Sequence, residues 1–260
     1  MLEEAKKQLD EQGYVLLPGV ITDTRREALA SRLGELYAAE GPEAGSEFRT
    51  EAGANRLANL VNKGAIFSDV VVEPEVVELA RHVLGQDVKL SSLNARSALP
   101  GGESAQPLHV DMGLLPDEKG PSGLNSIWML DEFRLDNGNV RLVPGSHTLG
   151  LRPQDALADP SAPHPEELRV TGNAGDVLVF NAHLWHAGTA NESDTPRLAL
   201  NCFYCRRDQP QQVWQKRWLD EALQSQIDGE LRSLLALDDL ENDRLSENPA
   251  ERSGFMKATR

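Results

Sequence analysis

Asp136-Asn137-Gly138-Asn139 separates two short apolar stretches of the chain, residues 125–131 and 139–143. Asn-Gly pairs favour tight hairpin turns, because both central positions of such a turn adopt a positive φ. The stretch therefore predicts two antiparallel strands joined by a turn. Further candidate strands lie on either side of it, at residues 87–93, 107–112, 167–171, 176–180 and 197–206. Many short strands with turn residues between them predict a sandwich, barrel or jelly roll.

Helical patterns precede this β region. Residues 2–12 repeat apolar side chains at helical spacing, and a short strand at residues 14–17 follows them. Thr24-x-x-Glu27 has the form of a capping box, which predicts that a second helix begins there. A third helix is expected to begin at Pro74, because proline suits the first turn of a helix.

Helical spacing returns from residue 211 onward. A chain of 260 residues favours one core domain with additions. We therefore expect a single domain over residues 1–260, mainly β with flanking α-helices. Its expected parts are a mainly helical N-terminal part (1–86), a jelly-roll core (87–208) and a helical C-terminal part (209–260).

Composition narrows the classes of partner. The formal net charge of −15 argues against nucleic acid and anionic membranes, since both require a basic surface. No apolar run approaches the length that spans a membrane. The first seven residues, MLEEAKK, are too charged for an export signal, so we expect a cytoplasmic protein.

The only two cysteines, Cys202 and Cys205, form a Cys-x-x-Cys sequence. This spacing can indicate a redox motif or half of a zinc site. Here it falls in a predicted strand, where residues i and i+3 face opposite sides. We therefore expect two unreactive buried thiols.

The chemistry of the chain centres on Gln106-Pro107-Leu108-His109-Val110-Asp111. On a strand, residues i and i+2 share a face, so His109 and Asp111 would point into the same space. They would supply two of the three ligands of a 2-His-1-carboxylate site for non-haem Fe(II). The alternative is a loop histidine beside a solvated aspartate, because His-x-Asp is common by chance.

Two histidines compete for the third ligand position. His183 and His186 follow the predicted strand at 176–180. Their spacing of three would suit a helix, but Gly188 and the preceding strand argue against one. Either residue, taken alone, is more typical of a structural histidine that forms a hydrogen bond than of a metal ligand.

Arg197 begins the predicted strand at residues 197–206. A guanidinium that faces a core requires a charged partner, and it binds a carboxylate through two parallel hydrogen bonds. An inward-pointing Arg197 would thus suit an acidic small molecule. The alternative is a local salt bridge to Glu192 or Asp194.

Taken together, these motifs resemble the phytanoyl-CoA dioxygenase family of Fe(II)- and 2-oxoglutarate-dependent oxygenases. The resemblance covers about residues 10–208 and implies a double-stranded β-helix, that is, a cupin-like jelly roll with flanking helices. The matching motifs, in order, are His109-x-Asp111, Asn137-Gly138, Pro144-Gly145-Ser146-His147, His186-x-Gly188-x-x-Asn191 and Arg197.

The resemblance also implies roles for individual residues. His109, Asp111 and His186 would be the iron ligands, and Arg197 would bind the distal carboxylate of 2-oxoglutarate. Gln106 and Trp128 would contact the cosubstrate or line the pocket. His183 would lie behind the metal ligands or in the pocket wall, whereas His147 would be structural. The expected cofactors are Fe(II), 2-oxoglutarate as cosubstrate, and O2. Further polar residues expected near the pocket are Arg49, Arg56, Asn94, Arg96 and Arg141.

The implied reaction is hydroxylation of a C–H bond in a small molecule, with decarboxylation of 2-oxoglutarate to succinate and CO2. Asp111 argues against halogenation, because related halogenases lack the carboxylate ligand. Desaturation, cyclisation or epimerisation at the same iron centre are alternatives. Others are a non-catalytic cupin-type ligand-binding module, a metal-dependent isomerase and a cofactor-free dioxygenase of cupin type.

Overall fold

The computed structural model describes residues 2–113, 115–247 and 255–256. Its larger sheet has six antiparallel strands, in the order β1-β7-β4-β9-β3-β2. A smaller sheet has the order β6-β5-β8. The larger sheet comprises β1 (Tyr14–Leu17), β7 (Val177–Asn181), β4 (Gly123–Met129), β9 (Arg197–Arg206), β3 (Val88–Ala98) and β2 (Ala54–Leu57); the smaller comprises β6 (Leu168–Val170), β5 (Val140–Leu142) and β8 (His186–Gly188).

The two faces of the larger sheet have different surroundings, because side chains alternate along each strand. On β4, Trp128 belongs to the hydrophobic cluster beneath the helices. Its neighbours Ile127 and Met129 belong to a second cluster, which is shared with strands β5 and β6 of the smaller sheet. The larger sheet is thus covered by helices on one face and by the smaller sheet on the other, which confirms the predicted jelly roll.

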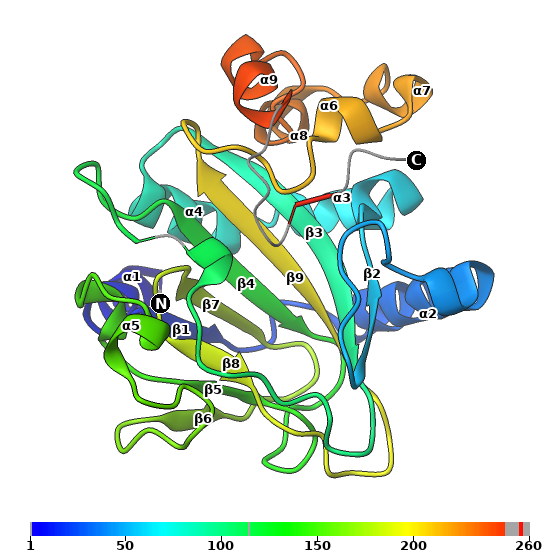
Figure 1. Cartoon of the computed structure of the whole chain (residues 1–260). Coiled ribbons are helices and arrows are strands. Elements are labelled where there is room, and N and C mark those ends of the chain that lie inside the picture. Colours follow the sequence, from blue (N-terminus) through cyan, green and yellow to red (C-terminus); the bar gives the residue numbers. More distant parts are fainter. Residues whose placement is uncertain (1, 114, 248–254, 257–260) are drawn as a thin grey trace.

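Four N-terminal helices cover the outer face, and Figure 1 shows α1 and α4 behind the larger sheet. Short helices follow the last strand and gather beyond the ends of β3 and β9 (Figure 1). The helices are α1 (Leu2–Gln12), α2 (Asp23–Glu40), α3 (Ile66–Val71), α4 (Pro74–Leu84), α5 (Pro153–Ala156), α6 (Gln215–Trp218), α7 (Glu221–Gln224), α8 (Gly229–Leu234) and α9 (Leu240–Glu247); the 3₁₀ turns are η1 (Gly41–Glu43), η2 (Leu60–Lys63), η3 (Asp111–Gly113) and η4 (Ser146–Thr148).

The helix boundaries confirm one prediction and correct another. Pro74 begins α4, as its fixed φ predicts. The capping box was wrong, because the cap of α2 is Thr22, two residues before Thr24. Thr22 has extended backbone geometry, and its hydroxyl accepts a hydrogen bond from the Arg25 N–H at 3.4 Å. Thr24 already lies inside the helix, so its side chain cannot act as the cap.

The antiparallel pair predicted around Asn137-Gly138 was wrong, because β4 and β5 on either side of this turn belong to different sheets. The predicted strand at residues 107–112 was also wrong. His109 forms only an isolated bridge with His186, and Asp111–Gly113 turns into the 3₁₀ element η3. Strands β2 and β8 and helix α3 were not predicted, because each is six residues or shorter and lacks a clear periodicity.

Cys202 and Cys205 lie on β9 as free, buried thiols. Burial raises the pKa of Cys202 to about 12 and that of Cys205 to about 11. Both sulfurs therefore stay protonated at neutral pH, as predicted for unreactive thiols. Separately, within the described part of the chain, no helix combines the length and the apolar character needed to cross a membrane.

Candidate metal centre and adjoining cavity

His109, Asp111 and His186 lie together between the two sheets. One potential ligand atom from each residue lies within 4.8 Å of the other two. The backbone brings them together: His109 N–H donates to the His186 carbonyl at 3.0 Å, and His186 N–H donates to the His109 carbonyl at 3.1 Å. The 3₁₀ element η3 begins at Asp111, two residues after His109, and turns Asp111 back toward His186. Nε2 of His186 lies 3.6 Å from the Asp111 carboxylate.

Hydrogen bonds define which nitrogen of each imidazole is free. Nδ1 of His109 lies 3.0 Å from the carbonyl of Pro107, and Nδ1 of His186 lies 2.8 Å from the carbonyl of Leu184. A carbonyl only accepts, so Nδ1 carries the proton in both rings. Each Nε2 therefore presents a lone pair, as a metal-ligating histidine requires.

The charge states of the cluster suit a divalent cation. Burial and the neighbouring His186 lower the pKa of His109 to about 4, so its ring is neutral at pH 7. For Asp111, burial alone would raise the pKa, but His186, His109 and Asn125 outweigh it and lower the pKa to about 2. Asn125 on β4 donates from Nδ2 to the second carboxylate oxygen at 2.9 Å. For His186, burial alone would lower the pKa, but the Asp111 carboxylate outweighs it and raises the pKa, so a metal must displace the proton of this ring. Once that proton is lost, two imidazoles and one ionised carboxylate form the donor set of non-haem Fe(II) sites.

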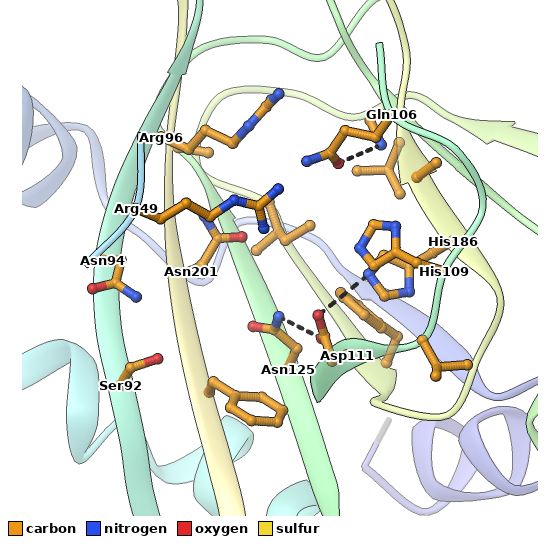
Figure 2. Close-up of a pocket in the computed structure, with 18 of the residues that line it drawn as sticks. Arg49, Ser92, Asn94, Arg96, Gln106, His109, Asp111, Asn125, His186 and Asn201 are labelled. Carbon is orange, nitrogen blue, oxygen red and sulfur yellow. Dashed lines mark hydrogen bonds and ion pairs between the residues drawn. The ribbon is translucent and has the colours of Figure 1, made fainter. Parts of the chain in front are cut away.

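The cluster forms part of the wall of a cavity of about 720 Å³, a size typical of small-molecule sites. Figure 2 shows the two histidines and Asp111 on one side of the cavity and the polar side chains of β3 and β9 on the other. Apolar residues of the wall include Ile127, Val140, Phe180 and Ala199.

Arg197, at the start of β9, also lines this cavity and is only 4% exposed. Its Nη2 donates to the Gly138 carbonyl at 2.6 Å, and its guanidinium stacks 4.0 Å from the centre of the Phe133 ring. Its Nε has no hydrogen-bond partner, and among the described residues neither Glu192 nor Asp194 pairs with it. Burial and the nearby Arg96 lower the pKa of Arg197 to about 9, so it remains a cation at neutral pH.

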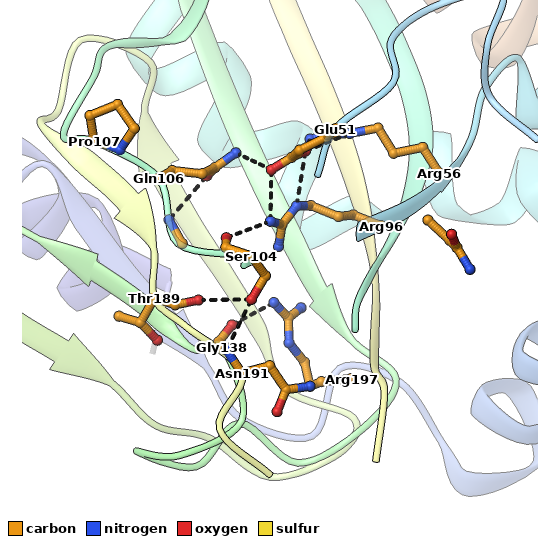
Figure 3. Close-up of polar contacts among 12 residues, drawn as sticks. Glu51, Arg56, Arg96, Ser104, Gln106, Pro107, Gly138, Thr189, Asn191 and Arg197 are labelled. Atoms are coloured by element: carbon orange, nitrogen blue, oxygen red, sulfur yellow. Dashed lines mark hydrogen bonds and ion pairs between the residues drawn. The ribbon is translucent and has the colours of Figure 1, made fainter. Parts of the chain in front are cut away.

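Gln106 lines the cavity as expected, but both ends of its amide are engaged by the protein. Its Oε1 accepts from the Gly188 N–H at 3.1 Å, and its Nε2 donates to Glu51 at 2.7 Å. Glu51 in turn pairs with Arg56 and Arg96, as Figure 3 shows. Gln106 therefore links the segment before His109 to β8 and to this charged network.

The structure places three other candidates outside the cavity. Trp128 is fully buried under the helices, where its indole N–H donates to Ser126, so the expected pocket contact is corrected. It faces outward because its strand neighbours Asn125 and Ile127 occupy the inward positions. His183 is likewise buried, and its Nε2 accepts from the Ser122 N–H at 3.0 Å. Arg141 instead pairs with Glu167 at 2.9 Å.

Four other polar residues lie where they were expected. Arg49, Arg56, Asn94 and Arg96 all line the cavity. His147 is structural, as expected, with Nε2 3.1 Å from the Asp10 carbonyl. Sequence reasoning missed Glu51 and Asn125. Glu51 lies in an aperiodic segment with no signal, whereas Asn125 could have been found as a polar residue at an inward strand position.

The fold and the cluster define a jelly-roll protein with a mononuclear site of the non-haem oxygenase type. The profile of the phytanoyl-CoA dioxygenase (PhyH) family matches residues 9–199. The chain therefore belongs to the phytanoyl-CoA dioxygenase family and is an oxidoreductase.

Similar proteins include Dioxygenase af480 of Aspergillus fumigatus, which is 29% identical over 246 residues, 91% of this chain and 77% of that protein. L-proline trans-4-hydroxylase of Streptomyces griseoviridis is 24% identical over 233 residues, 79% of this chain and 87% of that protein. The epimerase SnoN, solved with Fe3+, alpha ketoglutarate and nogalamycin RO, shares the fold with a TM-score of 0.64 and 23% identity, over 80% of this chain and 84% of SnoN.

Proposed function

We propose that this protein is an Fe(II)- and 2-oxoglutarate-dependent dioxygenase that hydroxylates a C–H bond of a small molecule. The observation that supports this most directly is the pairing of two features in one cavity: a His-Asp-His cluster, and a buried arginine that pairs with no acid in the described part of the chain. A buried unpaired charge is costly, so Arg197 is best explained by an acidic ligand. The distal carboxylate of 2-oxoglutarate would supply the missing partner.

Each residue has a defined task in this proposal. Nε2 of His109, Nε2 of His186 and the Asp111 carboxylate would hold the iron, with Asn125 keeping the carboxylate oriented. Arg197 would bind the distal carboxylate of 2-oxoglutarate through a guanidinium held by Gly138 and Phe133. When bound, iron and 2-oxoglutarate supply the oxidising chemistry, which yields succinate and CO2.

The cavity wall between these groups would exclude water from the reaction. Along the inward face of β9, Ala199 follows Arg197, and Ile127 on β4 pairs with Asn201, the next inward position of β9. Phe180 packs against His186 with ring centres 4.6 Å apart. These apolar side chains would cover the methylene carbons of 2-oxoglutarate, leaving its carboxylates to the polar ends of the site.

A second outcome at the same centre is epimerisation, which the likeness to SnoN favours as an alternative. The mass of the product separates the outcomes. Hydroxylation adds one oxygen atom, desaturation or cyclisation removes two hydrogens, and epimerisation leaves the mass unchanged. A non-catalytic ligand-binding module would consume no 2-oxoglutarate.

The proposal is tested by following succinate formation from 2-oxoglutarate in air with added Fe(II). We expect slow turnover by the wild-type protein even without the primary substrate. Asp111→Gly should reduce this turnover at least about 100-fold, because it removes the only carboxylate of the metal-ligand set. Asp10→Asn, a change of an exposed carboxylate, is the matched control. Succinate formation by Asp111→Gly at the wild-type rate would refute the assignment.

A further inference from the structure

Arg49 differs from three of the other four arginines around the cavity. It lies between η1 and β2, and Figure 2 shows its side chain extending into the cavity toward the side of the histidines. Arg56 and Arg96 both pair with Glu51, and Arg152 pairs with Asp155. Within the described residues, the Arg49 guanidinium has no such acid. Its main-chain N–H donates to the Gly45 carbonyl at 2.9 Å, which fixes the backbone that carries it.

The charge of the cavity is opposite to that of the chain. Five arginines line it in a protein whose formal net charge is −15. Glu51 and Asp155 offset part of this positive charge, and Asp111 belongs to the metal-ligand set. A concave site lined by one sign of charge concentrates ligands of the opposite sign. The arginines are Arg49, Arg56, Arg96, Arg152 and Arg197.

Two asparagines supply acceptors that the protein does not use. Asn94 on β3 and Asn125 on β4 line the cavity and are 5% and 9% exposed. Neither Oδ1 atom has a donor. For Asn125 the orientation is defined, because its Nδ2 faces the ionised Asp111 and its Oδ1 must therefore point elsewhere. Buried acceptors without donors are costly, which indicates that a ligand donates to them.

From these contacts we infer that the primary substrate is a small polar anion. Its carboxylate or phosphate would bind Arg49, and its O–H or N–H groups would donate to Asn94 and Asn125. This inference rests on the proposed function, because it assigns the second ligand of the same cavity.

The position of Asn94 separates this substrate from the cosubstrate. Asn94 pairs with Asn201 on β9, whereas Ala98 pairs with Arg197. Four residues of strand separate the two positions, about 13 Å at the usual rise. We therefore assign the end of the cavity at Arg197 to 2-oxoglutarate. The polar positions nearer the start of β3 are assigned to the substrate.

The test is affinity selection with mass spectrometry on protein loaded with Mn(II) and 2-oxoglutarate. The probe mixture contains amino acids, sugar phosphates and coenzyme A thioesters, each with a neutral counterpart: the amino-acid amide, the free sugar and the pantetheine thioester. Wild type is compared with Arg49→Gln, with Arg49→Lys and with Arg152→Gln as a matched cavity arginine that already has an acidic partner.

We expect wild type to retain at least one anionic compound at least about ten-fold better than its neutral counterpart. Arg49→Gln should abolish this preference and Arg49→Lys should keep part of it. Arg152→Gln should still prefer the anion, because Asp155 already offsets the charge of Arg152. The class retained distinguishes a carboxylate from a phosphate. The inference would be overturned if wild type retained the neutral counterparts as well as the anions. It would also be overturned if wild type and Arg49→Gln retained the same compounds, or if neither retained any.

Retention of 2-oxoglutarate shows whether the substrate class or the proposed function is wrong. If wild type retains 2-oxoglutarate but shows no dependence on Arg49, only the substrate class is wrong. If wild type retains no 2-oxoglutarate, the proposed function fails, and this inference fails with it.

Discussion

At the scale of single residues, Asn125 controls the orientation of the Asp111 carboxylate. Its amide nitrogen donates to one carboxylate oxygen at 2.9 Å, while the other oxygen lies on the side of His186. Partners behind a metal ligand of this kind usually contribute 10–100-fold to metal affinity, because they hold the ligand in a productive geometry.

We therefore predict that Asn125→Ala weakens Mn(II) binding by about 10–100-fold. The measurement is a titration followed by the loss of free Mn(II) signal in electron paramagnetic resonance. Asn201→Ala, which changes another asparagine of the same cavity, is the control and should bind as wild type. Unchanged affinity in Asn125→Ala would show that the carboxylate needs no such support.

Arg197 leads to a prediction on stability. Its buried guanidinium lacks an acidic partner among the described residues, so its desolvation is not offset until a carboxylate binds. Arg197→Met keeps the packing and removes the charge. Without ligands, this variant should be at least as stable as wild type in urea unfolding, and 2-oxoglutarate should no longer stabilise it. A loss of more than about 2 kcal/mol in the absence of ligand would contradict this view.

At the scale of elements, Glu51 joins three parts of the chain. It pairs with Arg56 on β2 and Arg96 on β3, and it accepts from Gln106, which also binds β8. The loop that carries Arg49 and the strand that carries His186 are therefore connected through one carboxylate (Figure 3).

The pKa of Glu51 predicts a pH dependence. Burial alone would raise it, but Arg96 and Arg56 outweigh burial and lower it to about 2 from an ordinary value of 4.5. Since the folded state holds the proton less tightly than the unfolded state, the stabilisation is complete above about pH 5 and is lost as the pH falls toward 2.

Glu51→Gln should thus lower the free energy of unfolding by about 2–4 kcal/mol at pH 7. The difference from wild type should shrink in urea unfolding series at pH 5, 4 and 3. Glu47→Gln, which removes a weaker and more exposed pair with Lys63, should cost at most about 1 kcal/mol. A Glu51→Gln deficit that is the same at every pH would exclude the ionised carboxylate as its cause.

The elements also show where sequence reasoning succeeds. Strands that form short apolar runs between turn residues, such as β4 and β9, and helices with clear boundaries, such as α4, could be predicted because their signals are local. The bridge between His109 and His186 could not, since it joins residues 77 apart in sequence through two backbone hydrogen bonds.

The candidate site could likewise be predicted only in part. His109, Asp111, His186 and Arg197 were found because their spacing resembles a family pattern, and the structure brings all four to one cavity. Trp128 was misplaced because the inward face of β4 depends on a register that sequence alone does not define.

At the scale of the whole molecule, the cavity is built by both sheets. His186 lies on β8 of the smaller sheet, whereas Asn125 and Arg197 lie on β4 and β9 of the larger sheet. Ligands bound between these strands connect the two sheets. A ligand that binds only the folded state stabilises that state by mass action.

We predict that Mn(II) and 2-oxoglutarate, each at 100 times its dissociation constant, raise the free energy of unfolding by about 2.7 kcal/mol per ligand. Thermal unfolding followed by circular dichroism provides the measurement. Arg197→Met should keep the effect of Mn(II) and lose that of 2-oxoglutarate at the same concentration. If 2-oxoglutarate stabilises both proteins equally, Arg197 is not its binding residue.

Iron and 2-oxoglutarate are proposed to bind together at His109, Asp111 and His186. An anaerobic optical titration of the metal-free protein with Fe(II) and 2-oxoglutarate tests this binding. We predict a weak visible charge-transfer band that requires both components. The band should be absent in His186→Ala and should need at least about ten times more 2-oxoglutarate in Arg197→Met. No band in folded wild-type protein, or a full band in His186→Ala, would contradict this proposal.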